Sequence, residues 1–191
     1  MQVILRRSFQ TAFLDMSGCV MVKMHYLDAS VLIKLFVKED DCDNVREFFL
    51  RNVNFCTTSL CLAEALARIK GMWKKGKDGK PKLTMDEYLA STRGLLRATH
   101  SFSNPHGKIE IDEKVLSDIS THSNVEQLAK DNKLDLSDAL QLYTIKQGKY
   151  SHLGPESASV LITADKKLAA AARRMGIRVW NCSIEELPEW A

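Results

Sequence analysis

Four acidic residues occupy positions where an ionised carboxylate is unusual. Asp28 and Asp165 come at the ends of predicted strands, each just before a predicted helix. Glu64 is the only charged residue in the apolar segment 59–67, and Asp138 stands between apolar residues at a predicted helix start. Because burial penalises an unpaired charge, each of these carboxylates needs a partner if it is buried.

Divalent metal binding is the chemistry that would bring these four residues together. In an open parallel sheet, ligands bind at the carboxyl ends of the strands. Carboxylates that share one pocket raise each other's pKa unless a divalent cation compensates their charge. All-oxygen ligation suits Mg²⁺ or Mn²⁺ rather than zinc. We therefore expect one Mg²⁺ or Mn²⁺ site lined by Asp28, Glu64, Asp138 and Asp165.

Helix capping is the competing interpretation for the three aspartates. Aspartate is among the best N-caps, so Asp138 and Asp165 could each simply begin a helix. Asp28 could likewise cap the apolar helix expected at 31–37, although Ser30 is better placed for that role.

Glu64 has a different alternative. An ion pair with Arg68 at i+4 would neutralise the carboxylate on the same helix, and the spacing allows it. This alternative stays open beside the metal site.

The elements that must position these residues follow from the hydrophobic pattern. From residue 24 onward, short apolar runs alternate with helical periods, and no hairpin turn signals separate them. Such alternation predicts right-handed crossovers and a parallel sheet of about five strands in an α/β three-layer sandwich. The expected strands are 24–27, 53–57, 108–111, 159–163 and 177–180, and the expected helices are 31–37, 43–50, 59–73, 84–96, 113–130, 137–147 and 166–175.

Length and composition agree with one globular domain. The chain has 191 residues, 45% of them hydrophobic, and we expect a single domain over 24–191 after an extension over 1–23. Met16, Met21 and Met24 are alternative translation starts to Met1. No apolar run approaches the roughly 18 residues that a membrane span needs. Five scattered cysteines without metal spacing favour a reduced, cytoplasmic setting.

The segments around the four acids resemble the PIN-domain nucleases, over residues 24–181. The resemblance is carried by four segments in the family's order, with a closing helix and strand that also fit: His25-Tyr-Leu-Asp28-Ala-Ser30, Ser59-Leu-Cys-Leu-Ala-Glu64, Leu134-Asp-Leu-Ser-Asp138-Ala-Leu140, Leu161-Ile-Thr163-Ala-Asp165, Leu168-Ala-Ala-Ala-Ala172 and Gly176-Ile-Arg-Val-Trp180.

The resemblance implies a metal-dependent endoribonuclease with strand order 3-2-1-4-5, in which the four acids hold the metal. Ser30 and Thr163 would be the hydroxyls that support them. The size is similar to VapC-type toxins of type II toxin–antitoxin pairs, which cut RNA and are silenced by a small antitoxin. The extension and an insert at 74–110 depart from those toxins. The alternative is a non-toxin PIN-domain protein that processes RNA or only binds RNA or protein. A homodimer is expected in either case.

A basic segment follows the helix that carries Glu64. Between Arg68 and Lys82 there are seven basic residues and one acid, whereas the whole chain carries a net charge of only +3. Lysines pair with phosphates and tryptophan stacks on unpaired bases, so this segment predicts an RNA contact. A solvated loop whose tryptophan packs into the core or a dimer interface is the alternative. The residues expected to touch RNA are Arg68, Lys70, Trp73, Lys74, Lys75 and Lys77.

Two other enzyme classes fit the sequence less well. Metal-independent acid–base cleavage would use histidine, but none of His25, His100, His106, His122 and His152 lies in a motif with a partner. Aspartate-nucleophile phosphatases require a second aspartate two residues after the first, where this chain has a serine after Asp28. The chain also contains neither a Walker-type loop nor a GxGxxG loop for nucleotide phosphates.

Overall fold

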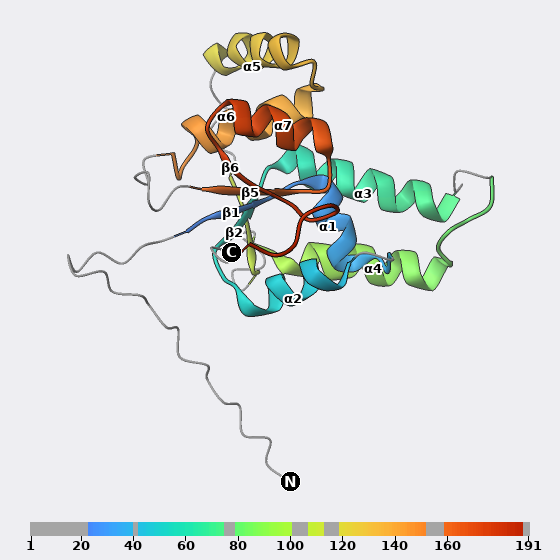
Figure 1. The fold of residues 1–191 in the computed structure, drawn as a ribbon. Helices are drawn as coiled ribbons and strands as arrows, with labels where there is room; N and C mark the ends of the chain where they lie inside the picture. Colours follow the sequence, from blue (N-terminus) through green and yellow to red (C-terminus); the bar gives the residue numbers. More distant parts are fainter. Residues whose placement is uncertain are drawn as a thin grey trace, which may run out of the picture.

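A parallel sheet of short strands forms the centre of the molecule (Figure 1). The computed structural model describes residues 23–39, 42–74, 79–100, 107–112, 119–151 and 159–188. The predicted extension therefore lies outside the described residues apart from Lys23, and so do Lys75 and Lys77 of the basic segment. Among the described residues, no helix has both the length and the apolar character needed to cross a membrane.

The sheet confirms the predicted topology. Five parallel strands lie in the order β4-β2-β1-β5-β6, which is 3-2-1-4-5 when these five are counted along the chain. A two-residue strand, β3, pairs with β4 at the edge and was not predicted. The strands are β1 (His25–Leu27), β2 (Phe55–Thr57), β3 (Thr99–His100), β4 (Ile109–Ile111), β5 (Val160–Thr163) and β6 (Arg178–Asn181).

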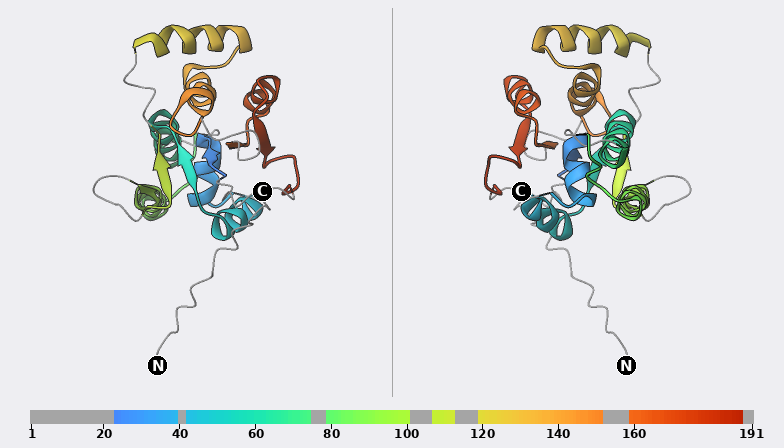
Figure 2. Two further views of the ribbon diagram at one scale, coloured as in Figure 1. Left: turned by 90° about the vertical axis from the view of Figure 1, so that its left-hand side faces the viewer. Right: turned by 90° about the vertical axis from the view of Figure 1, so that its right-hand side faces the viewer.

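Helices cover both faces of this sheet, which confirms the three-layer sandwich (Figures 1 and 2). Helices α1 to α4 lie on one face, α6 and α7 lie on the other, and α5 packs outside α6 as an additional layer. The helices are α1 (Ala29–Phe36), α2 (Asp43–Arg51), α3 (Ser59–Lys74), α4 (Met85–Ala98), α5 (Ile119–Asn132), α6 (Leu136–Gln147) and α7 (Lys166–Arg174).

Alternation along the strands divides the core between the two faces. Leu27 and Ile162 face α1 to α4, whereas Tyr26 and Leu161 face α6 and α7. Every residue of β1, β2 and β5 is buried, as expected for parallel strands covered on both sides. Asp28 therefore points to the face covered by α6 and α7, because it follows Leu27 in the alternation.

Helices α3 and α4 form a hairpin that extends beyond the sheet (Figure 1). The predicted capping box is present at the start of α4: Thr84 Oγ1 accepts from Glu87 N, and Glu87 Oε2 accepts from Thr84 N at 2.8 Å. Ser91 Oγ donates to the Phe36 carbonyl at 2.9 Å and so ties α4 to α1. The hairpin is thus fixed to the body of the domain near its base.

Candidate active site

Asp28 is the innermost of the four acids and is only 4% exposed. Its Oδ1 accepts from Ala29 N at 2.6 Å, and its Oδ2 accepts from Ser30 N at 3.3 Å, so Asp28 is the N-cap of α1. The expectation that Ser30 is the better cap was wrong, because α1 begins two residues earlier than predicted. Burial raises the pKa of Asp28, and these hydrogen bonds oppose that rise.

Two hydroxyls connect Asp28 to the end of β5. Thr163 Oγ1 donates to Asp28 Oδ2 at 2.9 Å and accepts from Asp165 N at 2.9 Å. Ser30 Oγ also donates to Asp28 Oδ2 and accepts from Ala164 N at 3.0 Å. Ser30 and Thr163 therefore both contact Asp28 and join it to the backbone that leads into Asp165.

Asp165 is the N-cap of α7, which confirms the capping interpretation for this residue. Its Oδ1 accepts from Lys167 N at 2.6 Å and from Leu168 N at 3.0 Å. Both capping bonds use Oδ1, so the cap does not depend on Oδ2. The residue is exposed at the surface end of the site. Capping and metal ligation are therefore compatible at Asp165.

Asp138 lies in the first turn of α6 and is not its cap, so the capping interpretation was wrong for this residue. Asp135 caps the helix instead and accepts from Asp138 N at 2.8 Å. The pKa of Asp138 is raised to about 7, first by burial and then by the negative charges of Asp28, Asp135, Asp165 and Glu64. The negative charges of all three other predicted site carboxylates therefore raise the pKa of Asp138.

Glu64 is half-buried and forms an ion pair with Arg68, whose Nε lies 3.2 Å from Glu64 Oε1. The proposed i+4 pair is thus confirmed. The expectation of deep burial was wrong, because the Glu64 side chain is 30% exposed despite its apolar sequence neighbours. An ion pair this exposed adds little stability, so it costs little to replace Arg68 by another cation.

The donor set fits a hard divalent cation. The structure brings Asp28, Glu64, Asp138 and Asp165 into electrostatic contact, and their combined charge keeps Asp138 partly protonated at neutral pH. A cation would relieve that repulsion, and carboxylate oxygens are the ligands that Mg²⁺ and Mn²⁺ prefer. In the described part of the chain, however, no three His, Cys, Asp or Glu side chains converge closely enough to hold a metal ion. The four carboxylates therefore interact electrostatically, but their oxygens do not converge on one point.

Three further residues at the site were not predicted. Asp135 adds a fifth negative charge beside Asp138. The Cys61 thiol of α3 is buried, and burial followed by the Asp28 charge raises its pKa to about 12. Gln141 is fully buried one turn after Asp138, and its amide has no hydrogen-bond partner among the described residues. Only the acidity of Asp135 is a signal that the sequence could have given.

The described histidines do not support histidine catalysis. His25 is buried at the opposite end of β1 from Asp28, where its Nδ1 lies 3.2 Å from the Val53 carbonyl and its ring contacts Phe48. His122 is exposed on α5. The side chain of His100 is outside the described part, as are residues 106 and 152.

The basic segment lies on the outer half of the α3–α4 hairpin. Arg68 is engaged with Glu64, whereas Lys70 and Lys74 are exposed. Trp73 is half-buried and stacks on Tyr88 of α4, with ring centroids 4.9 Å apart and an interplanar angle of 14°. The tryptophan therefore packs within the hairpin, away from the central core.

Comparisons with known proteins identify no family for this chain. No protein-family model matches the chain, and no curated protein does. The crystal structure of PAE2754 from Pyrobaculum aerophilum is similar at 21% sequence identity, with a TM-score of 0.48, over 83% of this chain and 92% of that one.

Proposed function

We propose that the protein is a metal-dependent endoribonuclease that hydrolyses RNA phosphodiester bonds at the carboxyl ends of β1 and β5. The observation that carries the proposal is the arrangement of Asp28 and Asp165 at the ends of β1 and β5, joined through the Thr163 hydroxyl, with the charges of Asp138 and Glu64 acting in the same region. Such a concentration of negative charge is costly unless it serves a cation-dependent reaction. The sequence resemblance to PIN-domain nucleases supports the same reaction.

Asp28, Asp165 and Glu64 would hold Mg²⁺ or Mn²⁺, with Asp138 beside them. When bound, the metal supplies an acidified water and neutralises charge on the attacked phosphate. The hydroxyls of Ser30 and Thr163 orient Asp28, because both donate to its Oδ2. The N-cap bonds of Asp28 and Asp165 hold both carboxylates on helix starts, where the partial positive charge of each helix favours the ionised form.

Asp138 is the residue best suited to proton transfer. A bound cation would offset the repulsion among the carboxylates and favour the ionised form of Asp138, which can accept a proton. We infer that a carboxylate oxygen of Asp138 takes a proton from the attacking water, whose oxygen bonds to phosphorus in line as the bond to the 3′ oxygen breaks. The leaving 3′ oxygen takes a proton from solvent. As the resemblance implies, the products would carry 5′-phosphate and 3′-hydroxyl ends.

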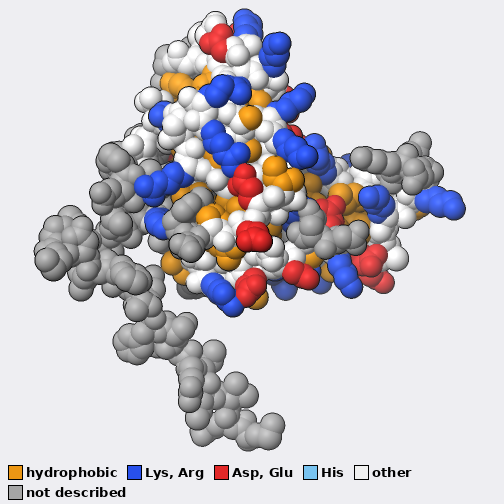
Figure 3. Space-filling model, in the orientation of Figure 1, with side chains coloured by type: hydrophobic (Ala, Val, Ile, Leu, Met, Phe, Trp, Pro, Cys, Tyr) orange, Lys and Arg blue, Asp and Glu red, His pale blue; other side chains and the backbone are white. Residues whose placement is uncertain are grey.

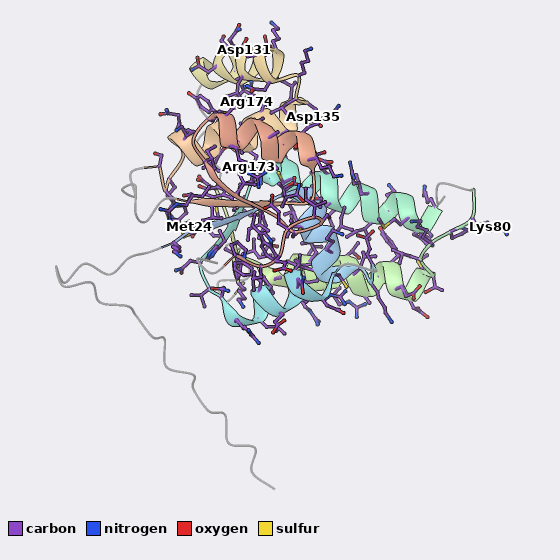
Figure 4. All side chains as sticks on the ribbon, viewed as in Figure 1. Met24, Lys80, Asp131, Asp135, Arg173 and Arg174 are labelled. Carbon is purple, nitrogen blue, oxygen red and sulfur yellow. The ribbon has the colours of Figure 1, made fainter. Side chains whose placement is uncertain are left out.

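Basic side chains close to the site would attract the polyanionic substrate. Lys166 and Lys167 are exposed on α7 directly after Asp165, and Figure 3 shows further basic side chains over the face formed by α5 to α7. Arg173 and Arg174 lie at the far end of α7 (Figure 4), where they bond to Glu185 and Asn132. The lysines nearest the carboxylates offset their charge as RNA approaches.

A cytoplasmic toxin is the biological role that fits this activity under the resemblance, with an antitoxin and a second copy of the chain as partners. The thiols of Cys42, Cys56 and Cys61 are free and buried, which suits a reducing compartment.

A non-catalytic RNA- or protein-binding module is the second candidate function. The observation that favours it is the Glu64–Arg68 ion pair, which occupies one predicted metal ligand. Under this alternative the four carboxylates would bind no cation and would take no part in a reaction.

An RNA-cleavage assay separates the two functions. The wild type, Asp28→Asn and the control Asp86→Asn would be incubated with tRNA, rRNA and mRNA in Mg²⁺, in Mn²⁺ or in EDTA. Asp86 is exposed on α4, so the control makes the same chemical change outside the site. We expect cleavage by the wild type and Asp86→Asn only, and none in EDTA. Equal cleavage by Asp28→Asn, or cleavage that persists in EDTA, contradicts the proposal.

A further inference from the structure

A hollow of about 400 Å³ lies at the tip of the α3–α4 hairpin, away from the carboxylates. Its walls include the apolar side chains of Trp73, Pro81, Leu83 and Met85. The polar residues of the wall are Lys82, Thr84 and Glu87, and the Glu87 carboxylate is bonded to Thr84 in the capping box. The hollow is therefore lined by both the aromatic ring of Trp73 and the positive charge of Lys82.

The Trp73 ring is supported from behind. Tyr88 stacks on it nearly in parallel, at 4.9 Å between centroids and 14° between planes, and Tyr88 does not line the hollow. Trp73 is half-buried, so part of the ring remains accessible. A planar ligand in the hollow would extend this stack without any rearrangement of the tyrosine.

The walls of the hollow are held by the backbone. Lys82 N and Leu83 N both donate to the Met72 carbonyl, at 2.8 and 3.3 Å, which fastens the returning chain to the end of α3. Gly79, with φ of +76°, permits the turn that brings it back. The capping box at Thr84 then fixes the start of α4. The hollow is thus formed before any ligand arrives.

The charge around the hollow selects the kind of ligand. Lys74 follows Trp73 and is exposed, and Lys80 is exposed at the end of the hairpin, where Figure 4 shows it. Lys74, Lys80 and Lys82 are thus three cations at this end of the hairpin, against one carboxylate in the wall, Glu87, which is bonded to Thr84. Stacking aromatics interleaved with lysines are the features by which proteins hold unpaired bases and their phosphates.

We propose that this hollow binds an unpaired base of the RNA substrate, with Trp73 as the stacking surface and Lys82 beside the phosphate. The inference rests on the proposed function and extends it from cleavage to substrate selection. Glu64 and Trp73 are nine residues apart on α3, which is about 14 Å along the helix axis. The bound base therefore lies more than one nucleotide from the cleaved bond. Because stacking on Trp73 requires an unpaired base, duplex RNA cannot provide it.

The test measures RNA binding separately from cleavage. Fluorescence anisotropy would follow a labelled single-stranded oligoribonucleotide binding to the full chain carrying Asp28→Asn, in EDTA. Adding Trp73→Ala should weaken binding about tenfold or more, whereas Trp73→Phe, which keeps an aromatic ring, should change it less than threefold. Binding of duplex RNA should not depend on Trp73. Equal affinity for Trp73→Ala, or an equal loss for duplex RNA, overturns the inference.

An abasic scan of the RNA tests the same contact by changing the ligand instead of the protein. Removal of one particular base should weaken binding to the Asp28→Asn protein, and this loss should vanish in the Trp73→Ala background. If no single position matters, the inference is wrong even when the wild type cleaves RNA. If instead the wild type fails to cleave any RNA but one position still matters, the hollow binds a base and only the nuclease proposal fails.

Discussion

The two ends of β1 place a buried ionisable residue in opposite surroundings. At the amino end, His25 packs against the rings of Phe48 and Phe55, and its Nδ1 lies within hydrogen-bond distance of the Val53 carbonyl. Burial lowers the pKa of His25, so the neutral ring is the stable form. Three residues later, Asp28 is equally buried, but the side chains that surround it include further carboxylates.

The two ends differ in the charge that each carries. The neutral His25 ring is held by aromatic packing and by the Val53 carbonyl, although its Nε2 is buried without a hydrogen-bond partner among the described residues. At the carboxyl end, hydrogen bonds stabilise Asp28, yet burial and the neighbouring negative charges raise the pKa of Asp138 to about 7. We infer that a cation from solution offsets the charge at this end.

Removal of charge at the carboxyl end should abolish activity. Asp165→Asn keeps an N-cap for α7, because asparagine caps as well as aspartate, but it removes one predicted metal ligand. We expect cleavage of RNA to fall at least about a hundredfold with little change in melting temperature. His25→Gln, at the amino end, should retain cleavage within threefold. Comparable losses for the two variants would remove the distinction between the ends.

Loss of the Thr163 hydroxyl should weaken metal binding through Asp28. Thr163→Val removes the donor to Asp28 Oδ2 and the acceptor for Asp165 N, and we expect Mn²⁺ affinity to fall about tenfold. Thr57→Val is the matched control. Thr57 is buried on β2, on the other side of β1 from Thr163, and it donates to the Leu27 carbonyl at 2.8 Å. Calorimetry that shows equal Mn²⁺ affinity for both variants would contradict the role of Thr163.

Asp138 should make the metal-free protein less stable as pH rises. The pKa of Asp138 is about 7 in the folded protein and near its ordinary 3.8 in the unfolded chain. Between these values the folded state holds a proton that the unfolded chain has lost, so stability falls with increasing pH. In EDTA, Asp138→Asn should remove this fall and gain on the order of 1–2 kcal/mol at pH 7.5.

Denaturation at a series of pH values checks this prediction, with Asp131→Asn as the control. Asp131 is exposed on α5 and should leave the pH dependence unchanged. A stability of Asp138→Asn that runs parallel to the wild type from pH 4 to pH 8 would show that the carboxylates do not interact as described.

His25 should give the opposite and smaller dependence. Its pKa is lowered in the folded protein, so the unfolded chain binds the extra proton as pH falls below about 6.5. Stability contributed by the neutral ring is therefore lost as the pH falls into the acid range. Denaturation of His25→Gln should show a flatter acid limb than the wild type. An unchanged acid limb would place the titrating group elsewhere.

The fold was predictable because each long strand is an apolar run between helical patterns. The strands at 160–163 and 178–181 lie within one residue of their predicted positions. The edge strand Thr99–His100 was missed, because two residues after a helix carry no periodicity and are paired only through their register with β4.

The structure places the four predicted carboxylates where their charges interact, but the sequence did not predict what surrounds them. Asp28 and Asp165 follow strands, and that position alone brings them to one edge of the sheet. The burial of Glu64 was misjudged because apolar neighbours in sequence occupy other faces of the same helix. The caps were misassigned at Asp28 and Asp138 because each helix start differs by one or two residues from the pattern. Gln141 gave no signal, since its burial depends on tertiary packing.

Titration of Mn²⁺ into the metal-free protein at pH 6.5 tests the central claim most directly. Calorimetry in two buffers of different ionisation heat gives both the affinity and the number of protons released. We predict that the wild type binds Mn²⁺ with release of a proton from Asp138, and that Asp28→Asn binds at least about tenfold more weakly. An absence of binding by the wild type, or equal binding by Asp28→Asn, would contradict a cation site at the carboxyl end of β1.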